Sequence, residues 1–317
     1  MKQYLSLLIL LFFFNQAVFA ATDTSYIETP ITLHTATGDI FGTLTTPKQF
    51  SVVPVALIIA GSGPTDRNGN SFLLKGKNNS LKQIAYALAN DGIASLRFDK
   101  RGVGNSYKAM KNQADLRFEN YIDDVNQWID LLKKDNRFNK IIIIGHSEGS
   151  LIGMIAAQHA DKYVSIAGPG QSADNILREQ LGNLPGQLKD TSFIILDSLK
   201  AGHHYSPVSS SLAMYFDASI QPYLISWFKY DPQVEIKKLK IPVLILQGTN
   251  DLQVKEKEAT LLAKANPAAK LVLIENMNHV LKLVTGDAEA NMNAYSDPSL
   301  QVSPILTKAM IDFIKAK

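Results

Sequence analysis

The 317-residue sequence contains no cysteine, which excludes thiol catalysis, zinc–thiolate sites and iron–sulfur clusters. It also lacks a strong excess of charge, because 32 basic and 29 acidic residues leave a formal net charge of only +3. So weak a balance, without aromatic residues interleaved among basic ones, predicts no nucleic-acid partner. Phosphate-binding loops, dinucleotide-binding fingerprints and the H-E-x-x-H motif are absent as well. We therefore expect neither a metal site nor a cofactor.

Long hydrophobic runs are also scarce. The longest apolar run near the start, Leu5–Phe14, is about half the length of the ~20 residues that span a bilayer. A lysine precedes this run, and Val18 and Ala20 are small residues at positions −3 and −1 of a cleavage site. This pattern predicts a secretory signal peptide at residues 1–20 and a periplasmic or extracellular chain without a stable membrane anchor. An uncleaved transmembrane anchor is the alternative interpretation.

What the sequence does contain is an alternation of buried strands and amphipathic helices, with 46% hydrophobic residues overall. Val55–Ala60 is continuously apolar and Lys140–Gly145 is the most β-branched run, as in strands buried on both faces of a parallel sheet. Apolar residues at steps of three and four between Phe118 and Leu132 predict an amphipathic helix. The predicted strands are 31–34, 40–45, 52–60, 93–98, 140–145, 163–167, 241–247 and 270–274, and the predicted helices are 80–90, 118–132, 148–160, 256–265 and 304–314. The alternation predicts an α/β fold with a mostly parallel sheet and helices on both faces.

One long segment, residues 168–240, interrupts this alternation. Its apolar residues have helical spacing, as at Ile176, Leu177 and Leu181, and no Gly/Ser-rich linker flanks it. We therefore expect a helical lid inserted into a single domain that spans residues 21–317.

The motif Gly145-His-Ser-Glu-Gly149 lies between a predicted buried strand and a predicted helix. G-x-S-x-G in that context is a nucleophile elbow, a sharp turn that exposes the serine hydroxyl at the carboxyl end of the strand. The helix that follows also places its positive dipole end at this point, where negative charge develops. Ser147 is therefore the predicted nucleophile, and the alternative is an ordinary strand–loop–helix junction.

A serine nucleophile needs a histidine base and a carboxylate that holds the histidine tautomer. Asp251 follows one predicted strand directly and His279 follows the next. Together they complete the order serine, acid, histidine that α/β-hydrolases use. The alternative bases His203 and His204 lie in the predicted lid.

Two other polar residues beside predicted strands receive different interpretations. His146 precedes the serine and is expected to point sideways from the turn. Asp99 lies in the sequence Asp-Lys-Arg-Gly-Val-Gly, which suggests an ion pair that braces a loop.

Acyl transfer also needs backbone N–H groups that bind the oxyanion. One is expected from Glu148, the residue after the nucleophile, and the other from the loop after the first long buried strand. That loop contains Gly61-Ser62-Gly63, and we predict the N–H of Ser62 as the second donor. The alternative is that this glycine-rich stretch is only a turn.

Four motifs together resemble bacterial α/β-hydrolases of the carboxylesterase and serine-aminopeptidase-like group. They are Gly145–Gly149, Arg97–Ser106, Gly61–Arg67 and Asn278–Val280, and the resemblance covers nearly all of the chain after residue 20. It implies an eight-stranded sheet, a lid over the site and hydrolysis of carboxylic esters. One departure concerns the second oxyanion donor, since many relatives have His-Gly where this chain has Ala-Gly.

The predicted activity is hydrolysis of a small-molecule ester through an acyl-enzyme intermediate, with the oligomeric state left open. In the predicted lid, Tyr223, Trp227 and Phe228 are candidates for lining an acyl pocket, or alternatively for sealing the lid onto the sheet. A serine peptidase or acyltransferase with the same three residues is the alternative enzyme. A non-catalytic binding protein of the same fold is the third hypothesis.

Overall fold

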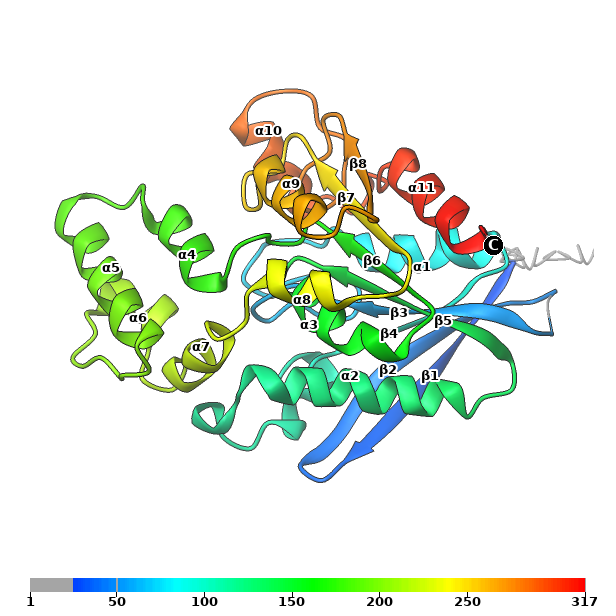
Figure 1. Cartoon of the computed structure of the whole chain (residues 1–317), viewed down its shortest axis with the longest axis horizontal. Coiled ribbons are helices and arrows are strands. Elements are labelled where there is room, and N and C mark those ends of the chain that lie inside the picture. Colours follow the sequence, from blue (N-terminus) through cyan, green and yellow to red (C-terminus); the bar gives the residue numbers. More distant parts are fainter. Residues whose placement is uncertain (1–24, 50, 317) are drawn as a thin grey trace, which may run out of the picture.

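The computed structural model describes residues 25–49 and 51–316, so the predicted signal segment at residues 1–20 lies outside the described residues. An eight-stranded sheet with the order β1-β2-β4-β3-β5-β6-β7-β8 runs through the molecule (Figure 1). Its strands are β1 Tyr26–Thr35, β2 Gly38–Pro47, β3 Val53–Ile59, β4 Ala94–Phe98, β5 Phe138–His146, β6 Lys162–Ile166, β7 Val243–Gly248 and β8 Lys270–Ile274. Only β2 pairs antiparallel, with β1 and β4, and all other neighbours are parallel. The predicted eight-stranded, mostly parallel sheet is confirmed.

The helices of the described chain cover both faces of this sheet or lie between β6 and β7 (Figure 1). They are α1 Ser80–Asn90, α2 Phe118–Lys133, α3 Glu148–Ala156, α4 Ala173–Leu181, α5 Gly186–Lys200, α6 Ser210–Phe216, α7 Gln221–Trp227, α8 Pro232–Lys238, α9 Glu256–Ala265, α10 Ala288–Asn293 and α11 Pro304–Lys315. Four short 3₁₀ helices are Gly104–Ala109, Gln113–Asp115, Ala157–His159 and Ala294–Ser296. None of the helices in residues 25–49 and 51–316 is long and apolar enough to cross a membrane.

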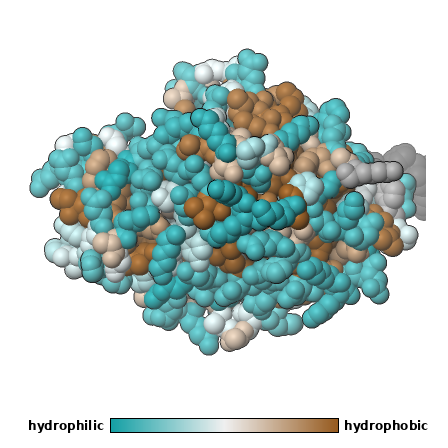
Figure 2. Space-filling model, viewed as in Figure 1, coloured by the Kyte–Doolittle hydropathy of each residue, from teal (hydrophilic) through white to brown (hydrophobic). Residues whose placement is uncertain are grey.

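Alternate residues of the central strands fill two separate cores, because successive side chains of a strand point to opposite faces. Val55 and Leu57 of β3 belong to the core shared with α2, α3 and α9. Ala56 and Ile58 belong to the core shared with α1 and α11 on the other face. Burial on both faces explains the continuous apolar run of this strand. The face of the molecule in Figure 2 is mostly hydrophilic, and its hydrophobic residues form separate small groups.

Helices α4 to α7 lie together at one end of the molecule and have a core of their own (Figure 1). Leu196, Phe216 and Phe228 are among its buried residues. The helices join the rest of the molecule at the start of α2, where the backbone N–H of Phe118 donates to Ser226 Oγ at 2.8 Å. We call α4 to α7 the helical segment. Helix α8 differs from them, because it packs on α3 and α9 beside the sheet.

Candidate active site

Ser147 occupies the turn between β5 and α3 in a strained conformation. Its φ of 55° and ψ of −122° are unusual for a residue with a side chain. Such strain persists only where the surrounding structure enforces it, and it clusters at functional sites. Here the backbone N–H of Ser147 donates to the carbonyl of Ile166 at 3.0 Å, which ties the turn to the end of β6.

The two glycines of the motif permit this turn through close packing of backbone. A Cβ atom on Gly145 would overlap the carbonyl oxygen of Gly149, and one on Gly149 would overlap the carbonyl oxygens of Ile59 and Ala60. The helix therefore approaches β3 and β5 as closely as it does only because both positions lack a side chain. The spacing of the motif is thus explained by packing around the serine.

Asp251 and His279 come together from the loops after β7 and β8. His279 Nδ1 lies 2.8 Å from Asp251 Oδ2, and both residues are buried. Burial alone would raise the pKa of Asp251, but the charge and hydrogen bond of His279 and the N–H groups of Val254 and Gln253 hold it below its ordinary value. The carboxylate is therefore ionised and accepts a proton from Nδ1, so in the tautomer that it favours Nε2 carries the lone pair.

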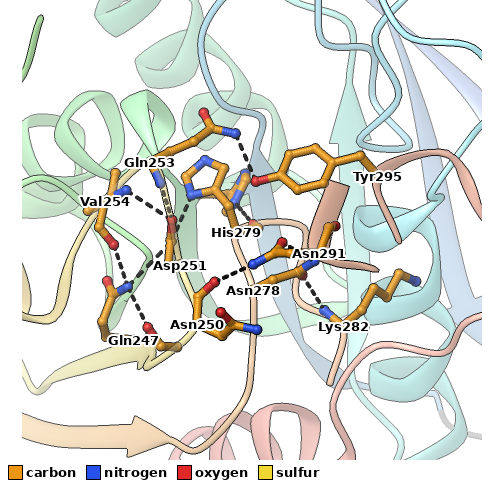
Figure 3. Close-up of polar contacts among 12 residues, drawn as sticks. Gln247, Asn250, Asp251, Gln253, Val254, Asn278, His279, Lys282, Asn291 and Tyr295 are labelled. Atoms are coloured by element: carbon orange, nitrogen blue, oxygen red, sulfur yellow. Dashed lines mark hydrogen bonds and ion pairs between the residues drawn. The ribbon is translucent and has the colours of Figure 1, made fainter. Parts of the chain in front are cut away.

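Backbone N–H groups and amide side chains hold Asp251 in place (Figure 3). Asp251 Oδ1 accepts from the N–H groups of Gln253 and Val254 at 2.8 and 2.9 Å. Gln247 Nε2 donates to Asp251 Oδ2 at 3.3 Å and to the carbonyl of Val254 at 2.7 Å. The carboxylate therefore has a fixed orientation toward the imidazole.

A second set of amides connects the two loops that carry the acid and the histidine (Figure 3). Asn291 of α10 donates through Nδ2 to the carbonyl of Asn250 at 2.7 Å. Its Oδ1 accepts from Asn278 Nδ2 at 3.1 Å. Because Asn250 precedes Asp251 and Asn278 precedes His279, the fully buried Asn291 ties the two loops to each other.

His146 contacts His279 directly, instead of only pointing sideways from the turn. Its Nε2 lies 2.9 Å from the carbonyl oxygen of His279, and the two rings are 4.8 Å apart. Burial and the neighbouring His279 lower the pKa of His146 to about 3, so the ring is neutral. Since a carbonyl only accepts, Nε2 of His146 carries the proton. This bond places the backbone of His279 against the residue that precedes Ser147.

The structure thus brings the predicted base to the turn that carries the predicted nucleophile. Within the described residues no hydrogen bond joins the Ser147 hydroxyl to the His279 imidazole. Catalytic hydrogen bonds are often long before substrate binds and shorten in the complex. The alternative bases, His203 and His204, are instead exposed on the helical segment.

The two predicted oxyanion donors lie on either side of the same turn. A Cβ atom on Gly61 would be 3.1 Å from Ser147 Cβ, so the loop that contains Ser62 lies against the serine. In the part of the chain that the structure describes, no group accepts a hydrogen bond from the backbone N–H of Ser62 or Glu148. Both donors are therefore available to a ligand.

The three aromatic residues predicted for an acyl pocket make packing contacts. Trp227 stacks on Phe118 with ring centroids 5.8 Å apart. Phe228 is 2% exposed and belongs to the core of the helical segment. Tyr223 donates its hydroxyl to Glu148 Oε1 at 2.5 Å. Trp227 and Tyr223 therefore join the helical segment to α2 and α3, and Phe228 packs inside the segment.

Sequence reasoning anticipated the brace at Asp99 but missed other supporting residues. Asp99 forms an ion pair with Arg67 at 2.7 Å and also accepts from the Arg67 backbone N–H. The roles of Asn291 and Lys100 were not anticipated. Asn291 lies in a short polar helix without an apolar stripe, and Lys100 pairs with Glu148, 48 positions away. No local sequence motif therefore indicates either residue.

Comparisons with known proteins agree with this architecture. A family profile described as serine aminopeptidase, S33, matches residues 75–169. The esterase EstD of Thermotoga maritima is 27% identical over 265 residues, which are 80% of this chain and 60% of that protein, so this chain spans less than two thirds of its relative's length.

Two solved structures share the fold over most of the chain. Est1E from Butyrivibrio proteoclasticus aligns with a TM-score of 0.57 and 17% identity over 90% of this chain and 99% of its own. The α/β hydrolase GrgF from Penicillium sp. sh18 aligns with a TM-score of 0.59 and 18% identity over 91% of this chain and 98% of its own. The strand order and these likenesses agree, and this chain has the α/β-hydrolase fold.

Proposed function

We propose that this protein is a serine hydrolase that cleaves small carboxylic esters through an acyl-enzyme intermediate. The observation that carries the proposal is the hydrogen bond between His279 and Asp251 beside the strained turn of Ser147. The esterase name of the Thermotoga relative supports the ester as substrate class. Serine, acid and histidine in this order on this fold form the machinery of acyl transfer.

In the first half-reaction, Ser147 Oγ attacks the ester carbonyl carbon and its proton passes to His279 Nε2. Asp251 stabilises the imidazolium that forms. The backbone N–H groups of Ser62 and Glu148 bind the oxygen that becomes negative. When the tetrahedral intermediate collapses, the bond to the leaving oxygen breaks and His279 donates its proton to that oxygen, which leaves as the alcohol.

In the second half-reaction, water attacks the acyl carbon while His279 takes its proton. Collapse of this second intermediate breaks the bond to Ser147 Oγ, which recovers a proton from His279. A carboxylic acid leaves and the free enzyme returns.

The test is Ser147→Ala assayed on p-nitrophenyl acetate. We expect kcat to fall on the order of 10⁶-fold, because the nucleophile and its base act as a unit. A fluorophosphonate probe should label the native protein and not the variant. Ser150→Ala is a matched control, because it removes another serine hydroxyl from the start of α3 while leaving the turn intact. Full activity or full labelling of Ser147→Ala would overturn the proposal.

A serine peptidase is the second candidate, favoured by the profile that matches residues 75–169. The same three residues would attack an amide, and His279 would protonate an amine leaving group. Parallel assays on aminoacyl nitroanilides and on p-nitrophenyl esters separate the two. Faster turnover of the nitroanilides, absent from Ser147→Ala, would make the peptidase the main activity.

A further inference from the structure

A buried ion pair lies behind the two predicted oxyanion donors. Lys100 follows β4 and its Nζ donates to Glu148 Oε2 at 2.5 Å and to the carbonyl oxygen of Gly61 at 2.7 Å. The side chains of Lys100 and Glu148 are only 2% and 3% exposed. One ammonium group therefore holds two loops, the one that precedes Ser62 and the one that begins α3.

Two tyrosines enclose this ion pair. The hydroxyl of Tyr223, from α7, donates to the second carboxylate oxygen, Glu148 Oε1, at 2.5 Å. Burial and the charge of Glu148 raise the pKa of Tyr223 well above its ordinary value, so the hydroxyl stays protonated as a donor. Lys100 Nζ also lies 4.8 Å from the centre of the Tyr121 ring, which offers its negative face to the cation. Both carboxylate oxygens and the ammonium are thus engaged.

The geometry of the peptide bond links this ion pair to the direction of the Ser62 N–H. In a trans peptide unit the C=O and the next N–H point in opposite directions. Because Lys100 holds the carbonyl of Gly61, the N–H of Ser62 is directed away from the lysine. Ser62 is exposed, and no described group accepts from its N–H. Lys100 therefore fixes the rotation of the peptide unit that carries one predicted donor.

The second predicted donor is fixed through the other end of the pair. The N–H of Glu148 belongs to the residue whose side chain binds Lys100. Lys100 therefore links the start of α3, through the Glu148 side chain, to the loop whose Gly61 carbonyl it also holds.

We propose that Lys100 is a positioning residue of the oxyanion hole, which orients the N–H groups of Ser62 and Glu148 through Gly61 and the Glu148 carboxylate. This inference rests on the proposed function and names a residue that sequence reasoning did not assign to the site. The role is geometric, because the Glu148 carboxylate offsets most of the ammonium's charge. Preorganised donors stabilise a transition state only when they already point to where charge develops.

A neighbouring ion pair supplies the matched control. Arg101 Nε donates to Asp124 Oδ2 at 2.8 Å, and both side chains are at most 10% exposed. Its partners are Asp124, Thr37 and the carbonyl of Ala109, none of which belongs to the proposed machinery. Lys100→Met and Arg101→Met therefore each leave one buried carboxylate unpaired in the same region, and only the first releases Gly61.

The experiment measures kcat, KM and thermal stability of both variants on p-nitrophenyl acetate. We expect Lys100→Met to lower kcat by about 10- to 100-fold with KM nearly unchanged, less than the 10²–10³-fold that loss of a whole oxyanion donor costs. Affinity for a trifluoromethyl ketone, whose adduct carries the oxyanion, should fall by the same factor. Arg101→Met should lose stability and keep kcat within about threefold.

The double variant Lys100→Met/Glu148→Met separates positioning from folding. Replacing both members of a buried ion pair with apolar side chains is often neutral or stabilising, so this variant should fold even if Lys100→Met does not. It keeps the backbone N–H of residue 148 and leaves the carbonyl of Gly61 unheld, so we expect kcat to stay at least tenfold low. Recovery of kcat together with stability would overturn the inference.

The remaining outcomes distinguish this inference from the proposed function. An active Ser147→Ala variant contradicts the proposed function whatever Lys100→Met does. An inactive Ser147→Ala variant combined with equal kcat values for Lys100→Met and Arg101→Met contradicts only the positioning role.

Discussion

The two sides of the candidate site are held together by different chemistry. On the side of Asp251 and His279, the supporting contacts come from backbone groups and from the amides of Gln247, Asn278 and Asn291. On the side of the oxyanion donors, the support comes from buried ion pairs, of which Lys100–Glu148 and Arg67–Asp99 are the nearest to the Ser62 loop.

The use of neutral amides on one side and ion pairs on the other matches the proposed role of each side. In the proposed mechanism His279 gains and loses a proton in every cycle, and a charged support would bias one of its two states. Neutral amides orient Asp251 and leave its carboxylate as the charge that faces the imidazole. The oxyanion donors keep one state throughout, and a fully engaged ion pair in a low-dielectric interior gives them a rigid support.

Among changes to the groups that support the site, the largest effect is expected from Asp251→Asn. The side chain keeps its size, but an amide nitrogen facing His279 Nδ1 favours the wrong tautomer of the imidazole. We expect kcat to fall on the order of 10⁴-fold on p-nitrophenyl acetate. Asp124→Asn is the control, since it weakens a buried ion pair to Arg101 and leaves His279 untouched. Equal kcat values for Asp251→Asn and Asp124→Asn would show that Asp251 has no special effect on His279, and the contrast between the two sides would be wrong.

Asn291→Ala tests the amide support at a residue that never meets substrate. The change removes the side-chain bonds from Asn291 to the carbonyl of Asn250 and to Asn278 Nδ2, which keeps only a 3.5 Å bond to the backbone carbonyl of residue 291. We expect a loss of about 1–3 kcal/mol in the free energy of unfolding, measured by urea denaturation. We also expect a roughly tenfold fall in kcat, because loosening the two loops weakens the orientation of His279. If the variant loses stability but keeps its kcat, Asn291 stabilises the fold and does not orient His279.

Much of the fold and the reacting residues follow from local patterns in the sequence. The helix 80–90 and the strand 270–274 have the predicted bounds, because apolar periodicity and turn residues define them. Ser147 is recognisable because its motif lies between a β-branched strand and a helix. Asp251 and His279 are recognisable because each directly follows a strand, and the carboxyl ends of parallel strands meet at one edge of the sheet.

The supporting residues could not be found in the same way. Lys100 pairs with Glu148 only after β4 and α3 are placed on the same sheet, so charge at either position looks like ordinary surface. Helix α10 has six residues, of which Met292 is the one large apolar residue, so no apolar stripe gave a signal for Asn291. Tyr223 was a candidate for the acyl pocket or for sealing the lid, and neither interpretation included the bond from its hydroxyl to Glu148. These contacts depend on tertiary placement.

The smallest expected effect is a pH dependence of stability that comes from Lys282, a buried lysine on the side of Asp251 and His279. Lys282, in the loop of His279, is fully buried, and its Nζ donates to Gln83 Oε1 at 2.7 Å and to the carbonyl of Leu300 at 2.6 Å. Burial lowers the pKa of Lys282 to about 8 from its ordinary 10.5. Between these two values the unfolded chain holds a proton that the folded chain has released, so the free energy of unfolding rises with pH.

The native protein should therefore gain stability toward pH 10 relative to its value near pH 8, and Lys282→Met should lack this contribution. The measurement is urea unfolding of both proteins at pH 7.5 and pH 10, compared as the difference between native protein and variant at each pH. Lys308→Met serves as the control, because that lysine lies in an exposed pair with Asp312. Identical pH dependence in the native protein and Lys282→Met would mean that Lys282 keeps its proton, and the amide side of the site would then contain a permanent buried charge.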